Sequence, residues 1–304
     1  MNVPAGILSG VSSRSWSRWI DLFSLGKPRI VLFVLLSALT GFLLGGSKPV
    51  DAVRLLQALL GTALAAAGSM ALNQYMEREA DSLMERTRRR PIPDGRLSPR
   101  SALWFGIGIL TAGVGYLATA VNLPSALFAA ATAVWYLLIY TPLKRKTPFC
   151  FLIGGVCGAT PPLIGWSAAT GNAPVGAWIL FAILFLWQIP HTLAIACLYR
   201  EDYTRAGILV LPAVDPDGAS TRRLILVSCL ALLSVPLLPT LVGMSGRIYF
   251  LAALMLGIGL LVYGIRLGSP SSVQAHRKLL LATLAYLPIL FVVMLLDAPA
   301  VFLW

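Results

Sequence analysis

The sequence predicts an all-α integral membrane protein built as a bundle of nine transmembrane helices. The 304-residue chain is 58% hydrophobic and only 12% charged, and its mean hydropathy is +0.81. Long apolar runs recur along its whole length. A run of about 18 or more apolar residues predicts a membrane span, because a hydrocarbon core ~30 Å thick needs about 20 helical residues.

Nine segments are long and apolar enough to be such spans. In chain order they cover residues 28–46, 52–74, 101–120, 124–141, 149–168, 175–198, 223–242, 247–266 and 279–296. A proline inside a span removes a backbone donor and is expected to kink its helix. The prolines in question are Pro161, Pro162, Pro190, Pro236 and Pro288.

Residues 1–27 precede the first span and are predicted to form a cytoplasmic interfacial segment. They lack an apolar core followed by a small-residue cleavage site, so no signal peptide is predicted. Trp16, Trp19, Ile20 and Phe23 alternate with Arg and Ser, as in a helix that lies on a membrane surface. A short mitochondrial presequence is the alternative, whereas the plasma (inner) membrane of a bacterium is the simpler location.

The basic residues predict the orientation of the bundle. Of the 24 lysines and arginines, all but Lys48, Arg54 and Arg247 fall on one side of the predicted spans. Because cytoplasmic loops carry the excess of positive charge, that side and the N-terminus are predicted to be cytoplasmic. The net charge of +12 therefore reflects topology rather than nucleic-acid binding. It favours anionic lipids and anionic substrates on the cytoplasmic face.

Two predicted cytoplasmic loops hold most of the twelve acids of the chain. Each loop follows an even-numbered span and mixes its acids with arginine, which is consistent with a weak internal duplication. The acids are Glu77, Glu79, Asp81 and Glu85 in the first loop, and Glu201, Asp202, Asp215 and Asp217 in the second.

The spacing of the first cluster predicts a metal site. Asn73, Glu77, Asp81 and Glu85 recur at every fourth residue, so on an α-helix each lies ~40° and ~6 Å from the one before. The first three would form a ladder of oxygen ligands as the helix leaves the membrane. Such ligands suit Mg²⁺, which typically binds through one or two carboxylates together with substrate phosphates.

Arg86 and Arg90 follow this ladder and could clamp phosphate oxygens. The combination predicts a lipid diphosphate held through magnesium. The alternative is that the acids and arginines pair with one another on a solvated helix face, which is the usual meaning of mixed charge. Against it, Asn73 carries the ladder into the apolar segment, where a polar side chain is unfavourable unless it is used.

Four stretches of the sequence resemble the UbiA-type intramembrane prenyltransferases. NQYMEREADSLMERTRRRP, residues 73–91, is similar to the NxxxDxxxD…RTxxRP motif of that superfamily. Three more stretches resemble the branch that farnesylates heme, the heme O branch. They are YTPLKRKTPFCFLIGGVCGATPPLIGW at 140–166, LFLWQIPH at 184–191, and YREDYTRAG followed by LP within 199–212.

The resemblance implies a fold and a reaction. Residues 28–304 would form a UbiA-type prenyltransferase domain whose active-site cavity faces the cytoplasm. Farnesyl diphosphate would bind through Mg²⁺, and its diphosphate would leave to give an allylic cation. A vinyl group of heme b would attack that cation, and water would complete a hydroxyethylfarnesyl side chain. Heme A synthase or another oxidase-assembly protein is a candidate partner beside the lipid bilayer, and no nucleic acid is expected.

The resemblance also implies roles for particular residues. Catalytic residues would come from both acidic regions, with Asn73, Glu77, Asp81 and Asp202 as Mg²⁺ ligands and Glu201 beside them. Substrate contacts would come from Arg86, Arg90, Tyr140, Lys144, Arg145, Trp187 and His191.

His191 has two interpretations. It could be a structural histidine bonded to backbone freed by Pro190, or a heme-side residue that acts as an axial ligand or as a propionate or proton contact. Trp166 and Trp187 lie in the selective motifs and could line a porphyrin pocket. His276 is expected to be a surface residue.

The sequence departs from the family pattern at five positions. Glu77 stands where the family usually has Asp, so its carboxylate reaches one methylene further. Tyr199 stands where other branches have the first Asp of their second motif, as is usual in the heme branch. Cys150, Thr192 and Leu209 replace an expected Asn, Phe and Pro.

Two alternative functions stay open at this point. One is a prenyltransferase of the same superfamily that acts on an aromatic quinone precursor. The other is a non-enzymatic transporter or heme-handling membrane protein. The charged residues gather at one rim rather than at mid-span, where transport sites usually lie, and this argues against a transporter.

Overall fold

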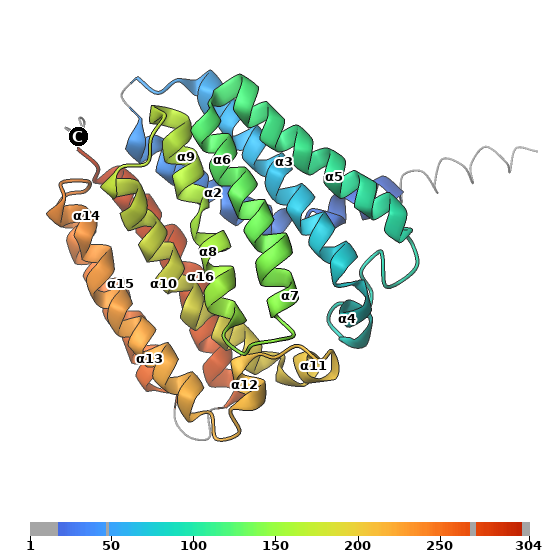
Figure 1. Ribbon diagram of the computed structural model, residues 1–304. Helices are drawn as coiled ribbons and strands as arrows, with labels where there is room; N and C mark the ends of the chain where they lie inside the picture. Colours follow the sequence, from blue (N-terminus) through green and yellow to red (C-terminus); the bar gives the residue numbers. More distant parts are fainter. Residues whose placement is uncertain (1–17, 47–48, 268–271, 300–304) are drawn as a thin grey trace, which may run out of the picture.

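The structure, a computed structural model, describes residues 18–46, 49–267 and 272–299. Within these residues nine helical segments are long and apolar enough to cross a membrane, and they pack side by side as one bundle (Figure 1). The predicted all-α fold is confirmed, and most span boundaries agree within a few residues. The spans are α2 Pro28–Gly45, α3 Ala52–Met76, α5 with η1 Pro99–Val121, α6 to α7 Leu123–Leu143, α8 with α9 Cys150–Thr170, α10 Val175–Leu198, α13 to α14 Ala219–Leu241, α15 Arg247–Ile265 and α16 Val273–Leu296.

Short polar side chains begin several of these helices. Asp51 accepts a hydrogen bond from the backbone N–H of Arg54 at 3.0 Å. Ser98 and Asn122 act in the same way at the starts of α5 and α6. Each of these side chains satisfies a backbone donor that the first helical turn leaves unpaired, which stabilises a helix by about 1 kcal/mol.

Only some of the prolines interrupt their spans. The fifth span is divided into α8, Cys150–Ala159, and α9, Pro161–Thr170. Pro236 lies in a 3₁₀ turn, η3 (Val235–Leu237), before the short helix α14 (Leu238–Leu241). In contrast, α10 and α16 run through Pro190 and Pro288 without interruption.

Two π-helical segments, which the sequence did not predict, widen the turns of the third and fourth spans. They are η1, Leu117–Val121, and η2, Trp135–Tyr140. A π-helical turn bonds i to i+5 and is often found at functional sites. In η2 the hydroxyl of Thr141 donates to the carbonyl oxygen of Tyr136 at 2.8 Å, which satisfies a backbone acceptor of the wide turn.

Glycines allow the helices to approach one another closely. A Cβ added at Gly165 would lie 1.8 Å from the carbonyl oxygen of Ala38, and one at Gly68 would lie 2.4 Å from the backbone nitrogen of Leu110. Helix packing in membranes uses small residues in this way, because lipid supplies no hydrophobic force between helices. The contacts of α2 with α9 and of α3 with α5 therefore depend on backbone proximity.

Replacing Gly165 by alanine is expected to destabilise the bundle by about 1–3 kcal/mol, because the new methyl group meets fixed backbone. Thermal unfolding of the detergent-solubilised protein measures this as a lower midpoint. Gly108→Ala is the matched control, since a Cβ there meets nothing within 4 Å. An unchanged midpoint for Gly165→Ala would show that α2 and α9 separate at no cost.

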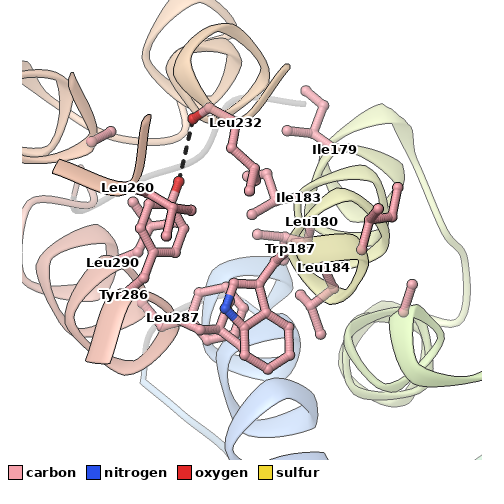
Figure 2. Close-up of a cluster of buried hydrophobic side chains, with 14 of the residues drawn as sticks. Ile179, Leu180, Ile183, Leu184, Trp187, Leu232, Leu260, Tyr286, Leu287 and Leu290 are labelled. Carbon is pink, nitrogen blue, oxygen red and sulfur yellow. Dashed lines mark hydrogen bonds between the residues drawn. The ribbon is translucent and has the colours of Figure 1, made fainter. Parts of the chain in front are cut away.

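The larger hydrophobic core lies in the C-terminal half of the bundle. Residues of α10, α13, α15 and α16 converge there, with Ile183, Leu232 and Leu290 fully buried (Figure 2). The few polar atoms are satisfied: the hydroxyl of Tyr286 donates to the carbonyl oxygen of Leu232 at 3.4 Å. This core holds α10 in place, and α10 carries several residues of the site described below.

Residues 18–25 are helical and precede α2. Trp19, Ile20 and Phe23 are exposed, whereas Asp21 is buried and forms an ion pair with Arg96 at 3.5 Å. An exposed apolar face with a tethered polar face agrees with a helix at a membrane interface. Residues 1–17, including Trp16, lie outside the described residues, so the interfacial segment stays a prediction.

Two distant loops pack together at one end of the bundle, and we call them the cap. The cap consists of residues 77–90, with α4 (Arg78–Leu83), and residues 199–212, with α11 (Arg200–Arg205) and the start of α12 (Leu211–Val214). All three short helices lie at the lower end in Figure 1. Ala80 and Met84 pack against Ala206 and Ile208 across the two loops. The two acidic clusters are thereby brought to one place.

Candidate active site

A cavity of about 610 Å³ lies between the helices and extends to the cap. Its volume falls in the range of small-molecule sites. At the cap end its lining is charged, from α2, α3 and the cap itself. Between the helices the lining is mostly apolar, with residues such as Phe33, Ala66, Ala129 and Ile164. Such a cavity fits a ligand with an anionic head and an apolar body.

The acidic ladder lines this cavity but is not one straight helix. Helix α3 ends at Met76, and Glu77 (φ −95°, ψ 7°) joins it to α4. Asn73, Glu77 and Asp81 still all line the cavity. The expectation of a continuous helix through these residues is therefore wrong, since Glu77 forms a junction. Glu85 follows α4, is half exposed and pairs with Arg88 at 2.7 Å.

Each member of the ladder contacts a lysine or an arginine. Lys144 Nζ lies 2.8 Å from Glu77 Oε1, and Arg90 Nη1 lies 2.6 Å from Asp81 Oδ2. The side chain of Asp81 is 1% exposed, so this ion pair is not on a solvated face. Buried charge is unfavourable unless it is well paired, and Arg90 supplies the partner that Asp81 needs at this buried place.

Asn73 is also held by hydrogen bonds on both sides. Its Nδ2 donates to Thr141 Oγ1 at 3.1 Å, and its Oδ1 accepts from Lys27 Nζ at 3.4 Å. The amide oxygen thus points toward the cationic groups of the site. These two contacts join α3 to η2 and to the start of α2.

Lys27 is a residue of the site that the sequence pattern indicates only as one of the basic residues that set the topology. It lines the cavity, and its φ of 48° makes it the one non-glycine residue with positive φ in the described ranges. The pKa of Lys27 is lowered to about 7. Burial is the largest cause, and the nearby positive charges of Arg90 and Lys144 act in the same direction. A strained backbone at a cavity residue is a reason to look for function. The sequence signal was a lysine directly before Pro28.

The pair of Glu77 and Lys144 is held in its charged form. Burial would raise the pKa of the Glu77 carboxyl, but Lys144 and Lys27 outweigh it and the pKa is lowered. Burial would likewise lower the pKa of Lys144, and the Glu77 carboxylate outweighs it so that the pKa is raised. Lys144 Nζ also lies 4.5 Å from the ring centre of Tyr140, a cation–π contact.

Arg86 is positioned by two tyrosines of the second loop. Its guanidinium carbon lies 4.7 Å from the ring centre of Tyr199 and 5.9 Å from that of Tyr203. Its Nη2 donates to the Tyr203 hydroxyl at 3.3 Å. The tyrosine at position 199, which departs from the aspartate of other branches, thus supports an arginine that lines the cavity.

Asp202 contacts the opposite loop instead of the cavity. Its Oδ1 and Oδ2 accept the backbone N–H groups of Glu85 and Arg86 at 3.2 and 3.3 Å, and Arg205 donates to Oδ1 as well. Burial would raise the pKa of Asp202, but Arg205 and the two N–H groups outweigh it and the pKa is lowered. Asp202 therefore acts as a clasp between the two loops, and its role as a metal ligand stays a prediction.

Nine of the predicted site residues line the cavity and three do not. Asp202, Glu201 and Arg145 are outside the lining, which contains Asn73, Glu77, Asp81, Arg86, Arg90, Tyr140, Lys144, Trp187 and His191. The described residues hold no group of three or more His, Cys, Asp or Glu side chains suited to a metal ion. The donors available for a hard cation are the amide of Asn73 and two carboxylates, which suits Mg²⁺ when phosphate oxygens complete its shell.

His191 is bound by α16 rather than by backbone freed by Pro190. Its Nδ1 lies 3.0 Å from Thr283 Oγ1, and its ring stacks on Trp187 at 4.7 Å. The interpretation as a histidine bonded to freed backbone is therefore wrong.

His276, expected at the surface, is buried, with 7% of its area exposed. Trp166 is buried against Gly45 and Gly176 and does not line the cavity.

The fold and the site define a class of protein, a membrane-spanning helical bundle with a charged cap over an apolar cavity. The model of the UbiA prenyltransferase family matches residues 34–301. The chain belongs to this family and, within it, to the protoheme IX farnesyltransferases, as its relatives show.

Three of these relatives cover nearly the whole chain, and each carries the name protoheme IX farnesyltransferase. The protein of Solibacter usitatus is 45% identical over 92% of this chain and 99% of its own length. That of Koribacter versatilis is 43% identical over 91% and 93%. That of Myxococcus xanthus is 40% identical over 98% of both.

Solved structures share the fold at low sequence identity. One, described as a digeranylgeranylglyceryl phosphate synthase in membranes, has a TM-score of 0.77 and 16% identity, with 92% of this chain and 98% of that chain covered. A UbiA homolog from Archaeoglobus fulgidus bound to GPP and Mg²⁺ has a TM-score of 0.62 and 18% identity, with 90% and 99% covered.

Proposed function

We propose that this protein transfers a farnesyl group from farnesyl diphosphate to a vinyl group of heme b, which gives heme O and releases diphosphate. The observation that carries the proposal is the cavity, in which Lys27, Arg86, Arg90 and Lys144 stand over an apolar interior. The relatives, all named for this reaction, support the choice of acceptor.

The basic residues at the cap would bind the diphosphate and stabilise it as it leaves. The C–O bond breaks, its electron pair departs with the diphosphate, and an allylic cation remains. Lys27, Arg86, Arg90 and Lys144 place positive charge where negative charge develops, which is an efficient form of catalysis in a site with little water.

The apolar part of the cavity would hold the farnesyl chain and the porphyrin together. The vinyl π electrons attack the allylic carbon, and the new carbon–carbon bond leaves a cation next to the porphyrin. One water molecule adds there and loses a proton, which yields the hydroxyethylfarnesyl group. Farnesyl diphosphate, heme b and water thus balance heme O and diphosphate, with one proton released.

Asn73, Glu77 and Asp81 would hold Mg²⁺ beside the diphosphate. When bound, the ion supplies charge neutralisation on the phosphate oxygens. The carboxylates that face the ion would then be released from Lys144 and Arg90, and both cations could turn to the phosphates. Glu77 is one methylene longer than the usual aspartate. Its carboxylate would therefore reach the ion from the junction between α3 and α4.

The protein would lie in the inner membrane of a bacterium with the cap and N-terminus on the cytoplasmic side. The cap end of the bundle carries most of the basic residues. Arg54 and Arg247 lie instead at the starts of α3 and α15, at the end of the bundle opposite the cap. Its partners would be the two substrates, the lipid bilayer and, as a candidate, heme A synthase or another oxidase-assembly protein.

A membrane assay with heme b, farnesyl diphosphate and Mg²⁺ tests the proposal. Mass spectrometry should detect farnesylated heme, and chelation of Mg²⁺ should abolish it. Prenylation of an aromatic quinone precursor instead of heme would favour the rival prenyltransferase. If a folded preparation prenylates neither acceptor, the transporter interpretation takes its place.

Lys27→Met is expected to raise the KM for farnesyl diphosphate about tenfold or more. A charge-assisted contact with phosphate contributes about 1.5–3 kcal/mol, and 1.4 kcal/mol is a factor of ten. Steady-state kinetics over a range of diphosphate concentrations measures the change. Lys146→Met is the control, because Lys146 is exposed on the same side and does not line the cavity. Equal kinetics for both variants would remove Lys27 from the site.

A further inference from the structure

His191 lies in the cavity away from the charged cap. It is placed about 10 Å before Leu198, the last residue of α10, by the 1.5 Å rise of a helix. The mechanism above gives it no part in binding the diphosphate. The ring nevertheless lines the cavity and is fixed by two neighbouring residues.

The hydrogen bonds around Thr283 determine which ring nitrogen of His191 carries the proton. The Thr283 hydroxyl has one proton and donates it to the carbonyl oxygen of Leu280 at 2.7 Å. It can therefore only accept at its 3.0 Å contact with His191 Nδ1, so Nδ1 is protonated. The lone pair of the neutral imidazole is consequently on Nε2, which has no hydrogen-bond partner among the described residues.

The orientation of the ring is fixed as firmly as its tautomer. His191 stacks on Trp187 with an angle of 19° between the rings. The indole Nε1 of Trp187 donates to the carbonyl oxygen of Thr283 at 2.7 Å, so both rings are tied to the same residue of α16. Figure 2 draws Trp187 within the core that immobilises it. A fixed imidazole whose Nδ1–H is already donated is the usual form of a metal-ligating histidine.

We infer that His191 Nε2 is the axial ligand of the heme iron when the porphyrin acceptor binds in the cavity, an inference that rests on the proposed function. Iron is the one metal that the acceptor brings, and imidazole nitrogen is a common axial ligand for it. The bond anchors the porphyrin at its centre, and its vinyl edge is thereby held at a constant distance from the cap. Thr283 is a positioning residue that keeps Nε2 available.

Heme titration of the purified full-length protein, without farnesyl diphosphate, tests the inference. The wild type is expected to show the absorption and resonance Raman signatures of histidine-ligated heme. His191→Ala should lose them, and added imidazole should restore them. Thr283→Val keeps the ligand but loses the acceptor for Nδ1–H, so heme affinity should fall about tenfold, as for other supporting residues of metal ligands. His276→Gln, outside the cavity lining, is the control for loss of a buried histidine.

The outcomes separate the two proposals. If the wild type binds and farnesylates heme but His191→Ala has the same heme spectrum, the axial-ligand inference is overturned and the proposed function stands. If the wild type binds no heme at all, both are overturned. Should His191→Ala fail to fold, His191→Gln and Thr283→Val take its place. Loss of the histidine-ligated heme spectrum in His191→Gln and a lower heme affinity in Thr283→Val support the inference, and wild-type behaviour of both variants overturns it.

Discussion

Asp81→Asn is expected to lower kcat/KM for farnesyl diphosphate by about 10²–10³, the usual effect of removing one group that stabilises developing charge. Asp81 is almost fully buried, lines the cavity and pairs with Arg90 at 2.6 Å. The asparagine keeps the shape of the side chain but removes the charge that would face Mg²⁺. The rate of heme farnesylation, followed by mass spectrometry on matched amounts of folded protein, measures the loss.

Glu85→Gln is the control for this experiment. It removes the same charge four residues further along, from a side chain that is half exposed and pairs with Arg88. Surface pairs of this kind contribute less than about 1 kcal/mol, so activity should stay within about twofold. Equal losses in both variants would point to the overall charge of the cap. Full activity of Asp81→Asn would move the metal site elsewhere.

Asp202→Ala is expected to lower kcat/KM by about 10–100-fold without removing a group from the cavity. The carboxylate accepts the backbone N–H groups of Glu85 and Arg86, and hydrogen bonds to charged groups contribute about 1.5–3 kcal/mol each. Without them the turn that carries Arg86 and Arg90 loses its fixed position. The KM for farnesyl diphosphate should rise, because both arginines would be ordered only when the substrate binds.

The magnesium dependence of this variant distinguishes a clasp from a metal ligand. If Asp202 only joins the two loops, excess Mg²⁺ does not restore the activity of Asp202→Ala. Asp202→Asn, which keeps one acceptor oxygen, is then expected to keep more activity than Asp202→Ala. If Asp202 ligates the ion, saturating Mg²⁺ restores activity in the alanine variant. Asp217→Ala is the control, since Asp217 is an exposed acid on the same side and accepts the N–H of Ala219 rather than an N–H group of the first loop.

The sequence predicts the spans well because hydropathy is a local property. All but one of the boundaries predicted from apolar runs lie within four residues of the observed ones, and 175–198 agrees at both ends. The wide turns of η1 and η2 were not predicted, because their apolar residues fit the hydropathy pattern of an α-helical span equally well. The junction at Glu77 was missed for a similar reason, since the four-residue spacing of the ladder is unaltered by it.

The candidate site could be predicted where its residues share a segment, and less well where distant segments meet. The spacing of Asn73, Glu77 and Asp81 was sufficient to place them together. Lys27 was missed because its approach to Asn73 depends on how α2 packs beside α3. Asp202 has the chemistry of a metal ligand, and only the packing of the two loops reveals its contacts with residues 85–86.

The π-helical segment η2 has a consequence for how the chain tolerates insertions and deletions. A π-helical turn holds one residue more than an α-helical turn, so η2 amounts to a one-residue insertion between Val134 and Thr141. Deleting a lipid-facing residue such as Leu138 would restore α-helical register and turn everything beyond it by about 100°. Lys144 would then leave Glu77 although every side chain of the site was intact. The length of this stretch is therefore as constrained as the identity of the charged residues that follow it.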